Sequence, residues 1–202
     1  AYGLRARAYL AMGEYAKAAE DAEKAMQGFT PASIADVSVP GFDDIEAGNW
    51  IWGIDITDAQ VSSSGYATSA SWASSFSGDG YAAACGVNMC INNLLYDKIP
   101  ATDVRKGWWL DENLHSPNWA NLTWGGAKGD EIASLILDDG SKVGFPAYTN
   151  IKFGMKSGIG STLNNNDWPL MRVEEMILIQ AEGLAKSGNE AKAKQVLEDF
   201  VK

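Results

Sequence analysis

The sequence predicts a mainly α-helical protein, in which helical hairpins form a scaffold around a large loop-rich insertion with short β-hairpins. Two observations carry this prediction. Both ends of the chain, 1–29 and 167–202, show small and aromatic residues at helical spacing. The stretch between them, 30–166, holds seven of the eight tryptophans and 16 of the 21 glycines, a composition typical of loops. The length of 202 residues suits one domain.

The first helical hairpin is predicted over 1–29. Ala6, Tyr9, Ala18 and Ala25 recur at helical spacing, and the pattern is interrupted at Gly13. A glycine between two helical patterns indicates a turn, because glycine readily adopts the left-handed conformation that ends a helix. This segment is therefore predicted to form a helix, a turn and a second helix.

The second helical hairpin, predicted over 167–202, repeats the first. Gly188 follows Gly13 by 175 positions, and small residues such as Ala181 and Ala193 again occur where two helices would cross. Such paired helices are the tetratricopeptide pattern, although two unrelated hairpins are the alternative. We expect Asp167 to cap the first helix of this pair, with Pro169 in its first turn.

The insertion over 30–166 is predicted to contain short elements joined by loops. These are a strand at 51–57, a surface loop at 57–77, a helix at 81–95, a hairpin with strands at 133–137 and 142–145, and a strand at 148–153. The first strand follows from alternating apolar residues, and the hairpin from the turn sequence Asp138-Asp139-Gly140-Ser141.

The charge balance excludes two classes of partner. Sixteen basic and 26 acidic residues give a net charge of −10, and phosphate groups of nucleic acids or lipids require a cationic surface. Seven basic and fifteen acidic residues lie in 30–166, so most of this charge belongs to the insertion. We therefore predict no nucleic-acid partner and no direct contact with an anionic membrane.

The cysteine and histidine content predicts no metal site and no cofactor. Cys85 and Cys90 would lie about 140° apart on a helix, too far apart to form a disulfide, and we expect both to be small buried side chains. His115 is the sole histidine, and we expect it to be exposed. One histidine without a thiol cluster does not make a zinc site.

Four segments carry a resemblance to a known family. DWPLMRVEEMILIQAEGLAKSGN at 167–189 is the most specific, and LRARAYLAMGEYAKAAEDAEKAM at 4–26, ATDVRKGWW at 101–109 and NIKFG at 150–154 accompany it. Together they resemble the SusD/RagB family of bacterial outer-membrane nutrient-binding lipoproteins. The resemblance implies a single SusD-like domain over the whole chain. It also implies that the chain is a fragment, because the family's lipid-bearing N-terminal cysteine, early helical region and C-terminal tail are missing.

The resemblance further implies a function at the cell surface. Such proteins are non-enzymatic receptors that capture glycans, or peptides in some members, for uptake through a TonB-dependent, SusC-like outer-membrane transporter. We accordingly expect a glycan ligand, this transporter as partner, and membrane attachment only through a lipid anchor absent from the fragment. Ligand-contacting residues vary within the family, so the resemblance assigns none to a position here.

The side chains of the insertion suit glycan binding. Flat aromatic rings stack against the C–H faces of sugars, and amide or carboxylate groups bind the hydroxyl groups around them. The candidate ligand-binding residues are Trp72, Tyr81, Trp108, Trp109, Asp111, Asn113, Trp119, Asn121 and Trp124. The densest run of them is 108–124. Packing is the competing role of any single tryptophan, and we assign Trp50, Trp52 and Trp168 to packing and Asp103 with Arg105 to a local pair.

Two other function classes remain as alternatives. A glycoside hydrolase needs two carboxyl groups held about 5–10 Å apart across the substrate, and neighbours in sequence such as Asp111 with Glu112 or Asp138 with Asp139 point in different directions. No nucleophile–histidine or phosphate-loop motif is present, so we predict no catalytic residues. A peptide receptor or tetratricopeptide-type interaction scaffold is the other alternative.

Overall fold

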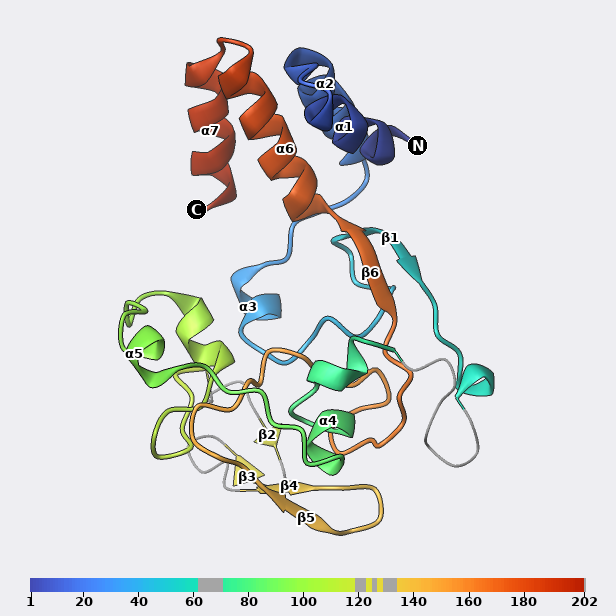
Figure 1. Cartoon of the computed structure of the whole chain (residues 1–202), viewed down its shortest axis with the longest axis vertical. Coiled ribbons are helices and arrows are strands. Elements are labelled where there is room, and N and C mark those ends of the chain that lie inside the picture. The colour runs from blue at the N-terminus through green and yellow to red at the C-terminus, as the bar shows by residue number, and fades with distance from the viewer. Residues whose placement is uncertain (62–70, 119–122, 125–126, 129–133, 202) are drawn as a thin grey trace. The chain divides into compact units, whose positions relative to one another are not determined.

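The computed structural model of the protein describes residues 1–61, 71–118, 123–124, 127–128 and 134–201 (Figure 1). The chain forms two compact units, each assembled from separated segments. The helical unit comprises Ala1–Ala32, Glu46–Gly53 and Pro169–Lys202, and the loop-rich unit comprises Ser33–Ile45 and Ile54–Trp168. Among the described residues, no helix combines the length and the apolar character needed to cross a lipid bilayer.

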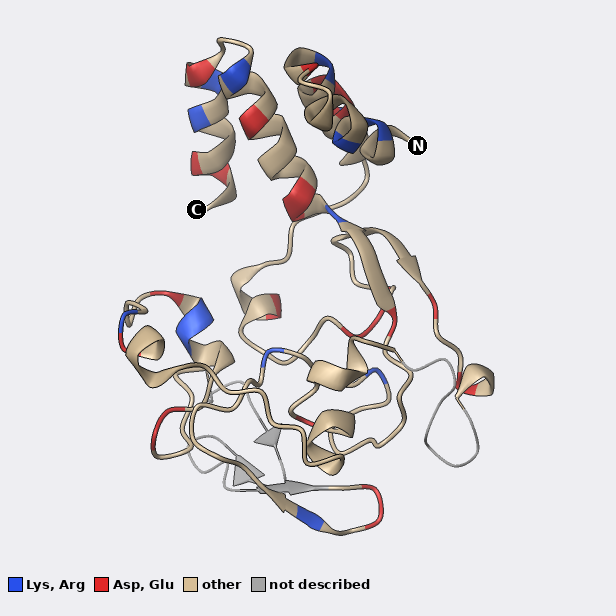
Figure 2. Cartoon of the chain, viewed as in Figure 1, with Lys and Arg blue, Asp and Glu red and all other residues tan. Residues whose placement is uncertain are grey.

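The helical unit contains the two predicted hairpins. The first pairs α1 (Tyr2–Ala11) with α2 (Tyr15–Ala25), and the second pairs α6 (Val173–Lys186) with α7 (Glu190–Phe200). Gly13 and Gly188 lie in the turns with φ angles of 76° and 88°, in the left-handed region that glycine tolerates. The helices carry charges of both signs (Figure 2), including the ion pairs Lys186–Glu182 and Lys194–Glu198. The mainly helical prediction is confirmed for this unit.

Small side chains let α2 and α6 approach closely. A Cβ atom on Gly183 would lie 2.6 Å from the carbonyl oxygen of Tyr15 and 3.1 Å from the Cβ atom of Ala19. Ala18 and Ala22 of α2 are buried in the same core as Met176 of α6. These small residues thus allow close packing between the two hairpins. The sequence pattern predicts them instead at the helix crossing within each hairpin.

The entry to α6 differs from the prediction. Residues Trp168–Arg172 form a strand, β6, which pairs with β1 (Trp50–Ile54), and the helix begins only at Val173. Pro169 is tolerated because the sheet has two strands and leaves each with a free edge. Asp167 is therefore not the helix cap. Pairing with a strand more than a hundred residues away overrides the local capping signal, which a reading of neighbouring residues cannot anticipate.

The loop-rich unit consists of short elements. They are α3 (Ile34–Val37), η1 (Asp58–Gln60), η2 (Ser74–Phe76), α4 (Tyr81–Ala84), α5 (Asn93–Tyr96), η3 (Val104–Trp108), β2 (Thr123–Trp124), β3 (Ala127–Lys128), β4 (Ser134–Ile136) and β5 (Lys142–Gly144), where η marks a 3-10 helix. The predicted hairpin is confirmed, since Leu135 of β4 pairs with Val143 of β5 in an antiparallel register.

Three predictions for the loop-rich unit are wrong. The helix expected at 81–95 stops at Ala84, because Gly86 turns the chain with a φ angle of 68°, and Asn92 caps a separate helix, α5. The strand expected at 148–153 makes isolated bridges to three different segments. Cys85 and Cys90 are exposed free thiols, because the helix that would have buried them is absent.

The interior of the loop-rich unit is unusually polar. Its apolar core is small and contains Leu110, Ile151, Phe145 and Leu137. Many polar side chains are buried as well, namely Ser71, Ser74, Ser77, Asp79, Ser116, Thr149, Asn164, Asn165, Asn166 and Asp167. Several of these side chains bind the backbone of distant segments, as Asn166 does at the carbonyl of Gly154 (2.7 Å). Hydrogen bonds thus replace regular secondary structure as the means of fixing these loops.

Candidate functional site

Four aromatic rings form a continuous row in the loop-rich unit. Trp72 lies edge-on to Phe76 with ring centroids 6.0 Å apart, Phe76 lies 5.4 Å from Phe153, and Phe153 lies 5.5 Å from Phe42. We call these four residues the aromatic row. Tilted and edge-on rings at such distances attract one another, so the four rings support one another.

The exposed end of the aromatic row is Trp72, whose side chain is accessible on 43% of its surface. The ring is backed by Phe76 of η2, and α4, which begins at the candidate Tyr81, packs against η2. Tyr81 is half-buried. The structure therefore brings the elements of two predicted ligand residues, Trp72 and Tyr81, into contact.

The candidate Trp108 lies near the other end of the row and has a structural role. Its indole N–H donates to the carbonyl oxygen of Val37 at 2.6 Å. The Lys152 ammonium lies 4.3 Å from the Trp108 ring and 4.6 Å from that of Phe42, so this cation links Trp108 to the row. With its N–H and one ring contact used, Trp108 offers less to a ligand than Trp72.

The candidates Asp111 and Asn113 lie in a tight turn. The Asp111 Oδ1 atom accepts hydrogen bonds from the backbone N–H groups of Asn113 (2.7 Å) and His115 (2.8 Å). Leu114 within this turn has a φ angle of 65°. Asp111 thus shapes the loop, while the Asn113 side chain is exposed. His115 is half-buried, contrary to the exposure expected from its isolation in the sequence.

The remaining candidates are described only in part. Trp109 is half-buried, and its backbone bridges Asn150. Trp124 lies in β2, where it pairs with Ala127 of β3. Trp119 and Asn121 lie outside the described residues. The run 108–124 therefore remains a predicted ligand surface, and among the described candidates Trp72 has the combination of exposure and aromatic support.

One packing assignment is wrong and points to a second aromatic surface. Trp50 is 5% exposed and packs as predicted, but Trp52 is 47% exposed. The two residues are two positions apart in β1 and share one face of the strand, so neither strand alternation nor the tryptophan content reveals that one is buried and the other exposed. Trp52 borders a hollow of about 470 Å³ in the helical unit. Its lining includes Tyr2, Lys24, Phe29, Ile51 and Met171.

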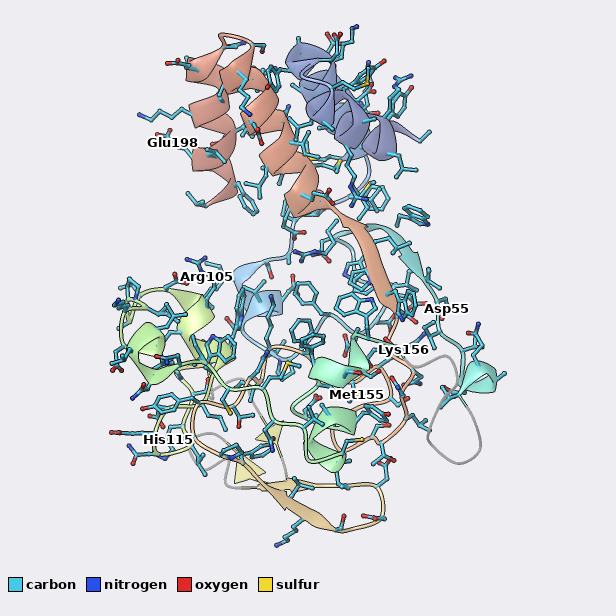
Figure 3. The ribbon with its side chains drawn as sticks, in the orientation of Figure 1. Asp55, Arg105, His115, Met155, Lys156 and Glu198 are labelled. Carbon is cyan, nitrogen blue, oxygen red and sulfur yellow. The ribbon has the colours of Figure 1, made fainter. Side chains whose placement is uncertain are left out.

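A buried ion pair anchors three segments of the loop-rich unit. Asp167 is fully buried and accepts hydrogen bonds from the Lys156 Nζ atom (2.8 Å) and from the backbone N–H groups of Ile45 (2.8 Å) and Ile56 (2.7 Å). Lys156 also reaches Asp55 at 2.7 Å, and Figure 3 shows these two side chains together. Burial lowers the pKa of Lys156, but its hydrogen bonds to Asp167 and Asp55 outweigh this effect and raise it.

The other charged candidates are engaged in local structure. Arg105 donates to both carboxylate oxygens of Asp103, which lowers the Asp103 pKa and confirms the predicted pair. Asp138 accepts from the backbone N–H of Thr162 (3.1 Å) and Asp139 from that of Ser141 (2.8 Å). These carboxylates shape turns.

Solved structures show which proteins share this fold. A SusD-like carbohydrate binding protein from Bacteroides vulgatus ATCC 8482 superposes with a TM-score of 0.61 at 22% identity, over 98% of this chain and 35% of the other. A SusD superfamily protein from Bacteroides thetaiotaomicron VPI-5482 gives a TM-score of 0.58 at 21% identity, over 99% of this chain and 39% of the other. No sequence model of a known protein family matches the chain, and no curated protein does.

The chain therefore has the fold of part of a SusD-like protein, which confirms at the level of the fold the resemblance found in the sequence. It spans somewhat more than a third of the length of these two proteins. The match includes both helical hairpins and the loop-rich unit, because it covers nearly every residue of the chain.

Proposed function

We propose that the chain is part of a non-enzymatic glycan-binding protein, and that Trp72 is the centre of its sugar platform. The observation that carries this proposal is the exposed Trp72 ring, which Phe76 contacts edge-on. A supported aromatic ring offers a sugar a flat apolar face at little cost in side-chain entropy. The shared fold with a SusD-like carbohydrate binding protein supports the same ligand class.

The cellular setting is part of the same proposal. The protein acts at the outer-membrane surface, held there by a lipid anchor, and passes its ligand to a TonB-dependent, SusC-like transporter. The tetratricopeptide-like hairpins α1–α2 and α6–α7 form its scaffold. The family resemblance supports these points, and co-purification of the full-length protein with such a transporter tests them.

The ligand class is tested with an oligosaccharide panel and two matched variants. We expect Trp72→Ala to weaken binding by about tenfold or more, which corresponds to the loss of roughly 1.4 kcal/mol of stacking. Trp52→Ala removes an equally exposed indole from the helical unit and should leave binding unchanged. Isothermal titration with the best sugar of the panel measures both values.

Each alternative function gives a different result in this experiment. If Trp52→Ala alone weakened sugar binding, the binding site would lie at the hollow of the helical unit, and the role of Trp72 would be refuted. Thermal stabilisation by peptides without binding of any sugar would favour a peptide receptor or interaction scaffold. Release of reducing ends from a polysaccharide would show a hydrolase.

A further inference from the structure

Asp79, in the loop-rich unit, is a carboxylate whose charge the described residues do not balance. Its residue is 1% exposed, and its Oδ1 atom has no hydrogen-bond partner among those residues. Burial, together with the nearby charge of Asp43, raises its pKa well above the ordinary value. A buried ionised carboxylate is costly unless an opposite charge or strong hydrogen bonds compensate it.

Asp43 is a second carboxylate at the same place in the fold. A Cβ atom on Gly154 would lie 2.9 Å from the Asp43 Oδ2 atom. Any larger residue at position 154 would therefore collide with this carboxylate. The backbone N–H of the next residue, Met155, donates to the carboxylate of Asp79. The two carboxylates thus flank the peptide that joins Gly154 to Met155. Neither forms an ion pair with a lysine or arginine in the described part of the chain.

At Asp167, groups of the protein itself compensate the charge of a buried carboxylate. It has the ammonium group of Lys156 and two backbone N–H donors within 3.0 Å. Asp79 and Asp43 contact Met155 and Gly154, one and two residues before Lys156, yet the Lys156 ammonium binds Asp167 and Asp55. Lys156 therefore does not compensate Asp79 and Asp43.

A proton shared by the two carboxyl groups is the simplest alternative, and the stability measurements below separate it from a bound cation. A proton on the Asp79 Oδ1 atom would make an O–H donor, which needs an acceptor when buried. That atom has no such partner among the described residues. A metal cation satisfies an oxygen atom directly and requires no further acceptor.

The available donors select the type of cation. All are oxygen atoms, which hard cations such as Ca²⁺ prefer, and neither histidine nor cysteine takes part. The segment Gly160–Ser161 packs on Asp79, with the Gly160 N–H 2.7 Å from the Asp79 carbonyl, and it leads to Asn164, whose buried Oδ1 atom also lacks a partner. The described residues hold no metal group of three or more His, Cys, Asp or Glu, so amide, carbonyl and water oxygens would complete the coordination.

We propose that Asp79 and Asp43 bind one Ca²⁺ ion in the interior of the loop-rich unit. The ion compensates the two carboxylates and ties the chain at 43, 79 and 154–155 together. This site is structural and is separate from the aromatic row that we propose for glycan binding. Its presence or absence therefore does not depend on the proposed function.

The test measures the thermal stability of the protein in EGTA, in CaCl₂ and in MgCl₂, together with Ca²⁺ titration calorimetry. We expect Ca²⁺ at about 100 times its dissociation constant to raise the Tm by roughly 5–10 °C, with one ion bound per chain. Mg²⁺ should do much less, because it dehydrates reluctantly and demands octahedral geometry. Asp79→Asn should abolish the shift, whereas the matched control Asp97→Asn, at an exposed position, should keep it.

Two results would overturn the proposal. One is a wild-type protein that binds no Ca²⁺ and shows no shift. An Asp79→Asn variant as stable as the wild type would then indicate that a shared proton neutralises the pair. The other is unchanged Ca²⁺ binding in Asp79→Asn. If that variant does not fold, Asp43→Asn and the calorimetric stoichiometry of the wild type decide the question.

Discussion

The helical unit and the loop-rich unit are stabilised in different ways. The helical unit packs alanine and glycine faces against one another, with a charged pair at its surface, Arg7–Glu175, and another, Arg5–Asp21, whose carboxylate is buried. The loop-rich unit has a smaller apolar core and buries serine, asparagine and aspartate side chains that bind distant backbone groups. This chain thus relies on shape complementarity where it has helices and on hydrogen bonds where it has loops.

The largest expected effect comes from removing the buried anchor of the loop-rich unit. Asp167→Ala leaves Lys156 without its buried partner and two backbone N–H groups without an acceptor. Breaking such a pair costs about 3–5 kcal/mol of unfolding free energy. Urea denaturation measures the loss. Asp55→Ala removes the exposed partner of the same lysine and should cost far less. Equal losses would contradict the role of Asp167 as the buried anchor of the loop-rich unit.

The next largest effect probes shape complementarity in the helical unit. Gly183→Ala places a methyl group 2.6 Å from the backbone carbonyl of Tyr15, which cannot move without shifting α2. We expect a loss of about 1–3 kcal/mol, which exceeds the gain of about 1 kcal/mol in helix propensity. Gly3→Ala is the control, because its methyl group meets the flexible side chain of Met171. A stabilised Gly183→Ala protein would refute the tight crossing.

A smaller effect separates packing from ligand binding in the loop-rich unit. Trp108→Phe keeps an aromatic ring beside Lys152 but removes the hydrogen bond to the Val37 carbonyl. We expect a loss of about 1 kcal/mol in chemical denaturation. Sugar affinity should stay within the error of the titration, in contrast to Trp72→Ala. A strongly reduced sugar affinity would instead indicate that Trp108 contacts the ligand.

The smallest effect concerns the Arg5–Asp21 ion pair of the helical unit, because Asp21→Asn keeps a side chain of the same size that can still accept hydrogen bonds from the half-exposed Arg5. The hydrogen bonds and charge of Arg5 lower the Asp21 pKa. A carboxyl group with a lowered pKa stabilises the fold above its unfolded value near 4 and loses this contribution as the pH falls through the folded value. Asp21→Asn should therefore lower the Tm slightly at pH 7 and not at all near pH 2. Melting curves of both proteins across this range measure the difference.

The two units also differ in how far the sequence predicts them. The hairpins of the helical unit follow from local spacing and from Gly13 and Gly188, whose positive φ angles are observed. The loop-rich unit depends on contacts between distant residues, such as the bond from Ile56 to Asp167, so a local reading placed a helix over Cys85 and Cys90 and a cap at Asp167. The ligand surface was predicted by composition, and Trp72 was among its members, but composition could not tell exposed Trp52 from buried Trp50.

The division of the helical unit among separate chain segments has a consequence for biosynthesis. Helix α2 ends at Ala25, but α6, on which it packs, begins only at Val173. At about 5–20 residues per second, the ribosome needs roughly 10–30 s to make the intervening segment. Throughout that time the alanine face of α2 has no partner from α6, while the loop-rich unit emerges complete. The order of synthesis thus favours folding of the loop-rich unit first and closure of the helical unit last.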